Sequence, residues 1–147
     1  MAFHSVFLVF LAGLALCSEA APSDHLDTEH PLSIKVVDSV RGSPAPNVEV
    51  KLYKEIADGV WKLLNSKQTN DKGVLPEFTT KEQFVEGLYR LELDLASYWK
   101  SMGLNPFYRR ADVIFTANDA GTRHHTLVVI LTPFSYSITA QLSEPVE

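Results

Sequence analysis

The stretch SIKVVDS, residues 33–39, decides the fold because its apolar side chains alternate. In an extended strand successive side chains point to opposite faces, so Ile34 and Val36 share one face while Ser33, Lys35 and Val37 share the other. The first face is suited to a core. The second places a lysine between apolar and hydroxyl neighbours. The stretch therefore predicts a β-strand with one buried face and one chemically mixed face.

The rest of the chain continues in short strand-like segments. β-Branched and aromatic runs alternate with turn signals such as RGSPAP at 41–46, NDKG at 70–73 and LTPFS at 131–135, a pattern typical of a sandwich or barrel. We expect strands over residues 32–38, 47–54, 61–69, 87–93, 111–117, 126–131 and 135–142. The pattern also allows a short strand over 73–75.

One segment, DLASYWKSMG at 94–103, breaks the strand pattern. Asp94 is a good helix N-cap, and Gly103 can end a helix in the left-handed conformation. We expect a helix of about two turns near Leu95–Ser101. The predicted fold class is all-β, a single sandwich or barrel domain with one short helix.

The N-terminus predicts a secretory signal peptide. Residues 6–15 form an apolar run of signal-peptide length that is too short to span a bilayer, and small residues at Ser18 and Ala20 suit cleavage after Ala20. The expected organisation is a signal peptide over 1–20, a flexible tail over 21–30 and a β-sandwich domain over 31–147. The expected localisation is extracellular.

Cleavage there would remove the only cysteine, Cys17, and one acid, Glu19, so the formal net charge changes from −5 to −4. A secreted domain without disulfides depends on its core or on self-association. The mild acidity argues against nucleic acid as a partner.

The sequence offers no obvious catalytic or metal site. The chain lacks a G-x-S-x-G elbow. His124 and His125 are adjacent, so on a strand they point to opposite faces and do not chelate one metal. Arg109 and Arg110 form too short a basic run for nucleic acid and predict a solvated loop. We expect no enzyme activity, no cofactor, no metal and no membrane association.

The last two predicted strands extend the mixed face. In HTLVVIL at 125–131 both faces are largely apolar, and in SYSITAQL at 135–142 one face carries small hydroxyl side chains. If these strands lie beside the first, one surface collects Lys35, Val37, Thr126, Val128, Ile130, Ser137 and Thr139. Such a surface suits an amphiphilic ligand with an acidic group. A solvated edge or a protein interface without ligand are the alternatives.

Four blocks of the sequence resemble the transthyretin branch of the transthyretin and hydroxyisourate hydrolase family. They are KVVDSVRGSPAPNV at 35–48, FVEGLYRLELDLASYWKSMG at 84–103, ADVIFTANDAG at 111–121 and LTPFSYSITA at 131–140. The resemblance spans 31–147. It implies a sandwich of two four-stranded sheets, a homotetramer built as a dimer of dimers, thyroid hormone transport in a central channel, and carriage of the retinol-binding protein with its vitamin A. It also implies a liability to amyloid.

Residues carried over by position define two expected sites. The thyroid hormone site comprises Lys35, Val37, Val74, Thr126, Val128, Val129, Ile130, Ser137, Ile138 and Thr139. The retinol-binding-protein surface comprises Val40, Arg41, Met102, Gly103, Leu104, Asn105 and Phe134. The resemblance implies that Lys35 pairs with the hormone carboxylate, while Ser137 and Thr139 meet its phenolic end.

Three positions depart from the family pattern. Val74 replaces a glutamate that faces the hormone's amino group, Val128 replaces an alanine and narrows the channel, and Gln141 replaces a valine at the contacts between dimers. We therefore expect these departures to weaken the binding of ligands without an amino group less than the binding of thyroxine. A tetramer that mainly serves a protein partner is an alternative.

The enzymatic branch of the family predicts a different set of residues. A hydroxyisourate hydrolase needs histidines at the positions of Lys35 and Thr126, an arginine at that of Val74 and a terminal Tyr-Arg-Gly-Ser, where this chain has TAQL at 139–142. Neither the general base nor the arginine is available, so hydrolase activity is not expected.

Overall fold

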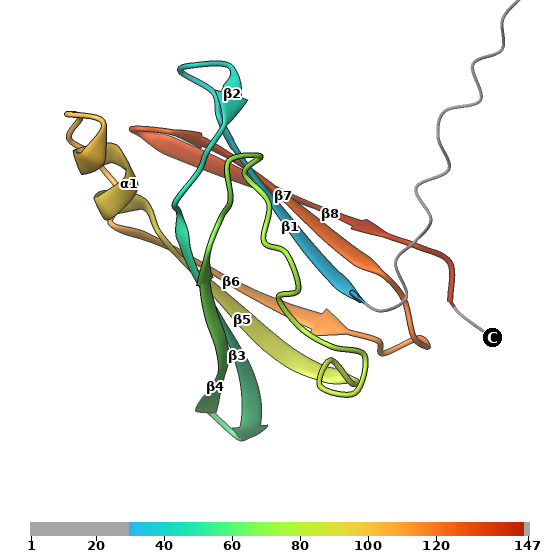
Figure 1. The fold of residues 1–147 in the computed structure, drawn as a ribbon. Coiled ribbons are helices and arrows are strands. Elements are labelled where there is room, and N and C mark those ends of the chain that lie inside the picture. Colours follow the sequence, from blue (N-terminus) through green and yellow to red (C-terminus); the bar gives the residue numbers. More distant parts are fainter. Residues whose placement is uncertain (1–29, 146–147) are drawn as a thin grey trace, which may run out of the picture.

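The computed structural model describes residues 30–145 as two four-stranded sheets and one helix (Figure 1). The elements are β1 (Leu32–Asp38), β2 (Ser43–Pro44), β3 (Glu49–Ala57), β4 (Val60–Gln68), β5 (Gly87–Asp94), α1 (Leu95–Ser101), β6 (Arg110–Ala117), β7 (His125–Thr132) and β8 (Ser135–Leu142). The predicted signal peptide, and all but the last residue of the predicted tail, lie outside the described residues.

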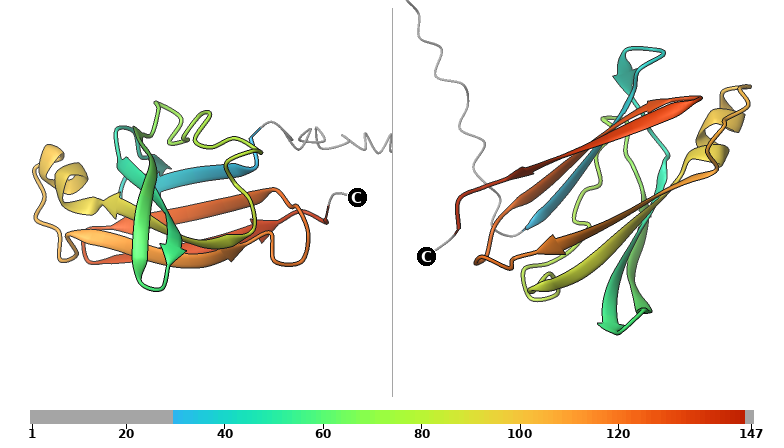
Figure 2. Two further views of the ribbon diagram at one scale, coloured as in Figure 1. Left: turned by 90° about the horizontal axis from the view of Figure 1, so that it is seen from below. Right: turned by 180° about the vertical axis from the view of Figure 1, so that it is seen from behind.

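The strand orders are β2-β1-β7-β8 in one sheet and β4-β3-β5-β6 in the other. β1 and β7 run parallel, and the remaining pairs are antiparallel. Figure 2 shows the two sheets as separate layers, with α1 beyond one end of them. The predicted all-β sandwich with one short helix is confirmed. No helix in the described part of the chain is long and apolar enough to cross a membrane.

The core lies between the two sheets and follows the predicted alternation. In β1 the burial pattern alternates, with Ile34 and Val36 fully buried and Lys35 exposed. β7 does the same, so the parallel β1–β7 pair presents one continuous apolar face inward. The inward-facing aliphatic side chains of these two strands are Leu32, Ile34, Val36, Leu127, Val129 and Leu131.

The helix forms where its end signals predict. The Asp94 carboxylate accepts a hydrogen bond from the Ser97 backbone N–H at 3.0 Å, and Gly103 adopts a φ of +72° after the last turn. The helix buries Leu95, Tyr98 and Trp99 against the sandwich. Burial of these side chains, more than helix propensity, stabilises so short a helix.

Three segments differ from the expected strands. Ser43 and Pro44, predicted as a turn, form the short edge strand β2, where a proline is tolerated because its nitrogen is not needed by the ladder. The predicted strand over 73–75 is reduced to a single bridge between Lys35 and Val74. The third strand begins at Glu49 because Asn47, with a φ of +59°, lies in a turn.

A buried carboxylate links the end of β1 to α1. The Asp38 side chain, with 0% of its surface exposed, accepts hydrogen bonds from the backbone N–H groups of Val40 (2.9 Å) and Arg41 (3.1 Å) and from the Tyr98 hydroxyl (2.6 Å). Burial, together with the bond to Asp38 and its charge, raises the pKa of Tyr98. The contact fixes the loop after β1 against the helix.

Candidate ligand-binding face

The outer surface of β1, β7 and β8, called the ligand face below, brings together most of the predicted hormone site. Neighbouring strands lie about 4.8 Å apart, and their register aligns the outward side chains in rows that run across the strands. The rows are Ser33–Thr126–Gln141, Lys35–Val128–Thr139 and Val37–Ile130–Ser137.

Lys35 lies at the centre of this arrangement. It is exposed, pairs across to Val128, and faces Val74 on its other side through the isolated bridge. Two hydrogen bonds hold the bridge in place: Val36 N–H to the Gly73 carbonyl (2.8 Å) and Leu75 N–H to the Ile34 carbonyl (3.2 Å). The row therefore reads Val74–Lys35–Val128–Thr139, one cation flanked by apolar side chains.

Charge is sparse on the ligand face. Lys35 is the only charged side chain in these rows, and no carboxylate stands beside it there. In the next row Ile130 is 42% exposed, which is high for an isoleucine in a sheet. The face thus offers one cation, an apolar strip and small hydroxyl groups, a combination suited to an apolar anion.

Two predicted site residues lie on the wrong face. Val129 is 1% exposed and packs in the core, and its partner across β8, Ile138, packs against the same core. Their side chains point away from the ligand face because neighbouring residues in a strand alternate. The side chains of Val129 and Ile138 are therefore not part of the ligand face, and this part of the positional transfer is corrected.

The strand register also adds residues that the expected site lacks. Ser33 and Gln141 share a row with Thr126 and extend the ligand face beyond Lys35. The Ser33 hydroxyl lies 3.2 Å from His124 Nε2. The alternation that places Lys35 on this face also places Ser33 and Gln141 there, so the sequence could predict the face of both residues. It could not predict that they share a row, because that depends on the register between strands.

The predicted retinol-binding-protein residues come from three segments. Val40 and Arg41 follow β1, residues 102–105 follow α1, and Phe134 lies in the turn between β7 and β8. Backbone hydrogen bonds join these segments at one end of the sandwich: Ser39 N–H to the Leu131 carbonyl (2.9 Å) and Phe107 N–H to the Pro133 carbonyl (2.8 Å). Among the predicted residues the exposed apolar side chains are Val40, Leu104 and Phe134, and the neighbouring Phe107, 70% exposed, adds to them.

The histidine pair behaves as alternation predicts. His125 is 4% exposed, its ring makes an edge contact with Phe84, and burial lowers its pKa. His124 points to the other side, toward Ser33. The Nδ1 atom of His124 is buried without a hydrogen-bond partner in the described structure, so no third group orients the ring as a general base.

The two sheets and the single helix define a prealbumin-like β-sandwich. The sequence model of the HIUase/Transthyretin family matches residues 32–139, and the chain belongs to this family.

Solved structures agree with this assignment. The crystal structure of transthyretin from Sparus aurata is 39% identical, with a TM-score of 0.75 over 78% of this chain and 99% of the other. A crystal structure of sea bream transthyretin in complex with thyroxine is 40% identical, with a TM-score of 0.74 over 80% of this chain and 99% of the other.

Proposed function

We propose that this protein is a secreted carrier that binds thyroid hormones, thyroxine and triiodothyronine, on the ligand face, within a channel formed by a homotetramer. One observation carries the proposal. Lys35 is a lone cation among apolar and hydroxyl rows, in a family of which a sea bream member forms a complex with thyroxine.

In the proposed complex, residues of two rows contact the hormone. Lys35 pairs with the hormone carboxylate, and Val37, Val128 and Ile130 contact the apolar rings. Ser137 and Thr139, one row apart on β8, offer hydroxyl groups to the phenolic end. A charge-assisted contact shielded from water contributes about 1.5–3 kcal/mol, so most of the remaining affinity comes from burial of the rings.

The test is displacement of a fluorescent probe from the purified protein, confirmed tetrameric by light scattering, with thyroxine and triiodothyronine as competitors. We expect saturable displacement that Lys35→Ala weakens roughly tenfold or more. Lys81→Ala, at an exposed lysine outside the ligand face, is the matched control. Failure of both hormones to displace the probe from an intact tetramer would refute hormone binding.

Val74 governs the choice among ligands. An apolar side chain opposite Lys35 gives no partner to a ligand ammonium group, so thyroxine leaves its amino group unpaired while a deaminated analogue does not. Val74→Glu is expected to improve thyroxine relative to the deaminated analogue by about tenfold. An unchanged affinity ratio between the two ligands would show that Val74 does not contact this end of the ligand.

The hydrolase branch of the family is not favoured here. The positions implied for its histidines and arginine hold Lys35, Thr126 and Val74 on the ligand face, and Ser33 pairs with a histidine that lacks an orienting partner. We infer that the protein has no hydrolase activity. Turnover of hydroxyisourate above the spontaneous rate, lost in Lys35→Ala, would overturn this.

A second proposed role is binding of the retinol-binding protein at the end of the sandwich near α1. The observation that favours it is the cluster of exposed apolar side chains, of which Phe134 is 71% exposed. Phe134→Ser is expected to weaken binding of the retinol-loaded partner in biolayer interferometry without changing hormone displacement. Equal binding of the partner by the wild type and by Phe134→Ser would argue against this surface.

A further inference from the structure

The outer face of the second sheet carries a cleft that the proposed hormone function does not use. It lies where β3 and β5 meet the start of α1 and the start of β6, and its volume is about 360 Å³. This volume falls within the range of small-molecule sites. It opens on the sheet opposite the ligand face, so the two sites share no residue.

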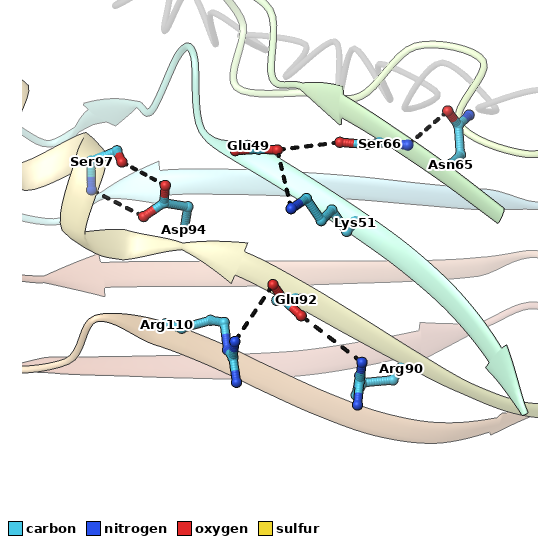
Figure 3. Close-up of polar contacts among 9 residues, drawn as sticks. All are labelled: Glu49, Lys51, Asn65, Ser66, Arg90, Glu92, Asp94, Ser97 and Arg110. Carbon is cyan, nitrogen blue, oxygen red and sulfur yellow. Dashed lines mark hydrogen bonds and ion pairs between the residues drawn. The ribbon is translucent and has the colours of Figure 1, made fainter. Parts of the chain in front are cut away.

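The carboxylates of the cleft all have partners. Glu49 Oε1 lies 3.6 Å from Lys51 Nζ, Glu92 Oε1 lies 3.7 Å from Arg110, and Asp94 caps α1 through Ser97 (Figure 3). The two ion pairs offset the charges of Glu49 and Glu92, whereas the hydrogen bonds from Ser97 satisfy Asp94 without neutralising its charge.

Two cations of the cleft have no such partner. Lys100 and Arg109 line it, both are exposed, and neither forms an ion pair within residues 30–145. Two positive charges then stand against one unneutralised carboxylate, Asp94, so the uncompensated charge of the cleft is positive by one, although the chain as a whole is acidic. An anion is the ligand that such a cleft selects.

The basic segment is held in place. The Arg109 carbonyl accepts hydrogen bonds from the N–H groups of Leu95 (3.1 Å) and Ala96 (2.9 Å), which fixes its backbone against α1. The neighbouring Arg110 guanidinium is held by Asp112 at 3.0 Å. Arg109 is exposed in the loop, as predicted, while the exposed Arg110 already begins β6. Both arginines also line one wall of the cleft, and of the two only the Arg109 side chain has no ion pair within residues 30–145.

We propose that this cleft binds a small anionic sugar, one that carries a sulfate or a phosphate group. Arg109 and Lys100 take the anionic group, the arginine through its paired N–H donors and the lysine as a point charge. The carboxylates of Glu49 and Asp94 and the hydroxyl of Ser97 accept hydrogen bonds from the sugar hydroxyls. An inorganic anion alone has no hydroxyl group to donate to the remaining lone pairs of these acceptors.

Because both cations are exposed, binding is weak and sensitive to salt. Exposed ion pairs are screened within about 10 Å at 0.1 M salt. We expect a dissociation constant of about 1 mM at low ionic strength.

The experiment is isothermal titration calorimetry of the purified protein with glucose 6-sulfate, glucose 6-phosphate, inorganic sulfate and neutral glucose, at low salt and at 0.5 M NaCl. At least one anionic sugar should bind saturably, inorganic sulfate about tenfold more weakly, and glucose not at all. The stronger of the two sugars identifies the anionic group. Equal binding of inorganic sulfate would overturn the sugar part of the proposal, and no saturable binding of either sugar would overturn all of it.

Variants locate the site. Lys100→Gln combined with Arg109→Gln should weaken binding at least tenfold, while Lys81→Gln, at an exposed lysine outside the cleft, should not. An equal loss in the two proteins would reduce the interaction to general surface charge and overturn the site. Circular dichroism checks that the double variant is folded. The double variant should still bind hormone in the probe-displacement assay, so a failure at the cleft can be told apart from a failure at the ligand face.

Discussion

Replacing Tyr98 with phenylalanine should expose how strongly one hydrogen bond ties α1 to the first sheet. The hydroxyl donates to Asp38 Oδ2 at 2.6 Å, and the acceptor is fully buried. Phenylalanine keeps the ring and its edge contact with Trp99, at 5.0 Å between centroids, so the change removes the bond without removing the packing.

The expected cost follows from what the carboxylate retains. Asp38 keeps the two backbone N–H donors on Oδ1, but within residues 30–145 the remaining polar partner of Oδ2 is the half-exposed Arg41 side chain, whose Nε lies 3.8 Å away. A solvated cation at that distance compensates little. A hydrogen bond to a charged group contributes about 1.5–3 kcal/mol, so Tyr98→Phe should lower the free energy of unfolding by about 2 kcal/mol at pH 7.

The same bond predicts a pH signature. The pKa of Tyr98 is raised in the folded protein, so above pH 10 the unfolded chain releases a proton that the folded protein keeps. The stability that Tyr98 confers is complete below pH 10 and falls by up to about 1.4 kcal/mol per pH unit above it. The gap between wild type and Tyr98→Phe should therefore narrow as the pH rises from 9 to 11.

Urea unfolding at fixed protomer concentration measures this gap, since a tetramer would make stability depend on concentration. Tyr89→Phe is the matched control. The Tyr89 hydroxyl donates at 2.6 Å to a neutral acceptor, the Val85 carbonyl, so its loss should cost only about 1 kcal/mol. A cost for Tyr98→Phe no larger than that of the control, or a gap that stays constant up to pH 11, would refute the reasoning.

Two further perturbations test the core. His125 is buried against Phe84 with a lowered pKa, so the stability it confers is complete above pH 6.5 and is lost as the pH falls. In urea unfolding, His125→Phe should remove up to about 1.4 kcal/mol of the stability loss that the wild type shows between pH 7.5 and 5.5. Parallel curves of stability against pH for the two proteins would contradict this. Gly73→Ala should lower the free energy of unfolding by about 2–4 kcal/mol, because a Cβ there would lie 2.4 Å from the Val36 carbonyl oxygen. Gly59→Ala, with a similar positive φ but open space around it, should lower it by only about 1–2 kcal/mol. Equal denaturation midpoints for the two variants would rule out the steric reason.

The alternation of side chains carried most of the fold and much of the ligand face. SIKVVDS assigns Lys35 and Val37 to one side of β1 without any knowledge of neighbours, because a strand has a period of two. The same rule places Val129 and Ile138 on the core side. The positional transfer from the family pattern assigned both to the hormone site, and here the physical pattern was the more accurate guide to side-chain direction.

The pairings between distant segments were beyond sequence reasoning. The bridge between Lys35 and Val74 depends on how the loop after β4 folds back along β1. The buried charge of Asp38 depends on a tyrosine that lies 60 residues away in the chain. Hydrophobic periodicity sets the faces of single strands, but it contains no information about which strand edge or helix comes next to them.

The two outer faces of the sandwich differ in whether their charged side chains form ion pairs. On the second sheet Ile114 is 58% exposed, but it lies opposite Arg90 on a face that carries ion pairs such as Glu49–Lys51 and Glu92–Arg110. Among the described residues the ligand face carries no ion pair, and it leaves Ile130 exposed beside Val37. Burying an apolar side chain of this size contributes about 1.5–3 kcal/mol on either face, but on the ligand face no ion pair has to lose its water when a ligand or a second copy covers it, so association there carries the smaller polar cost. A central channel between copies would then form over Lys35, which places the single cation where an apolar anion can be held away from water.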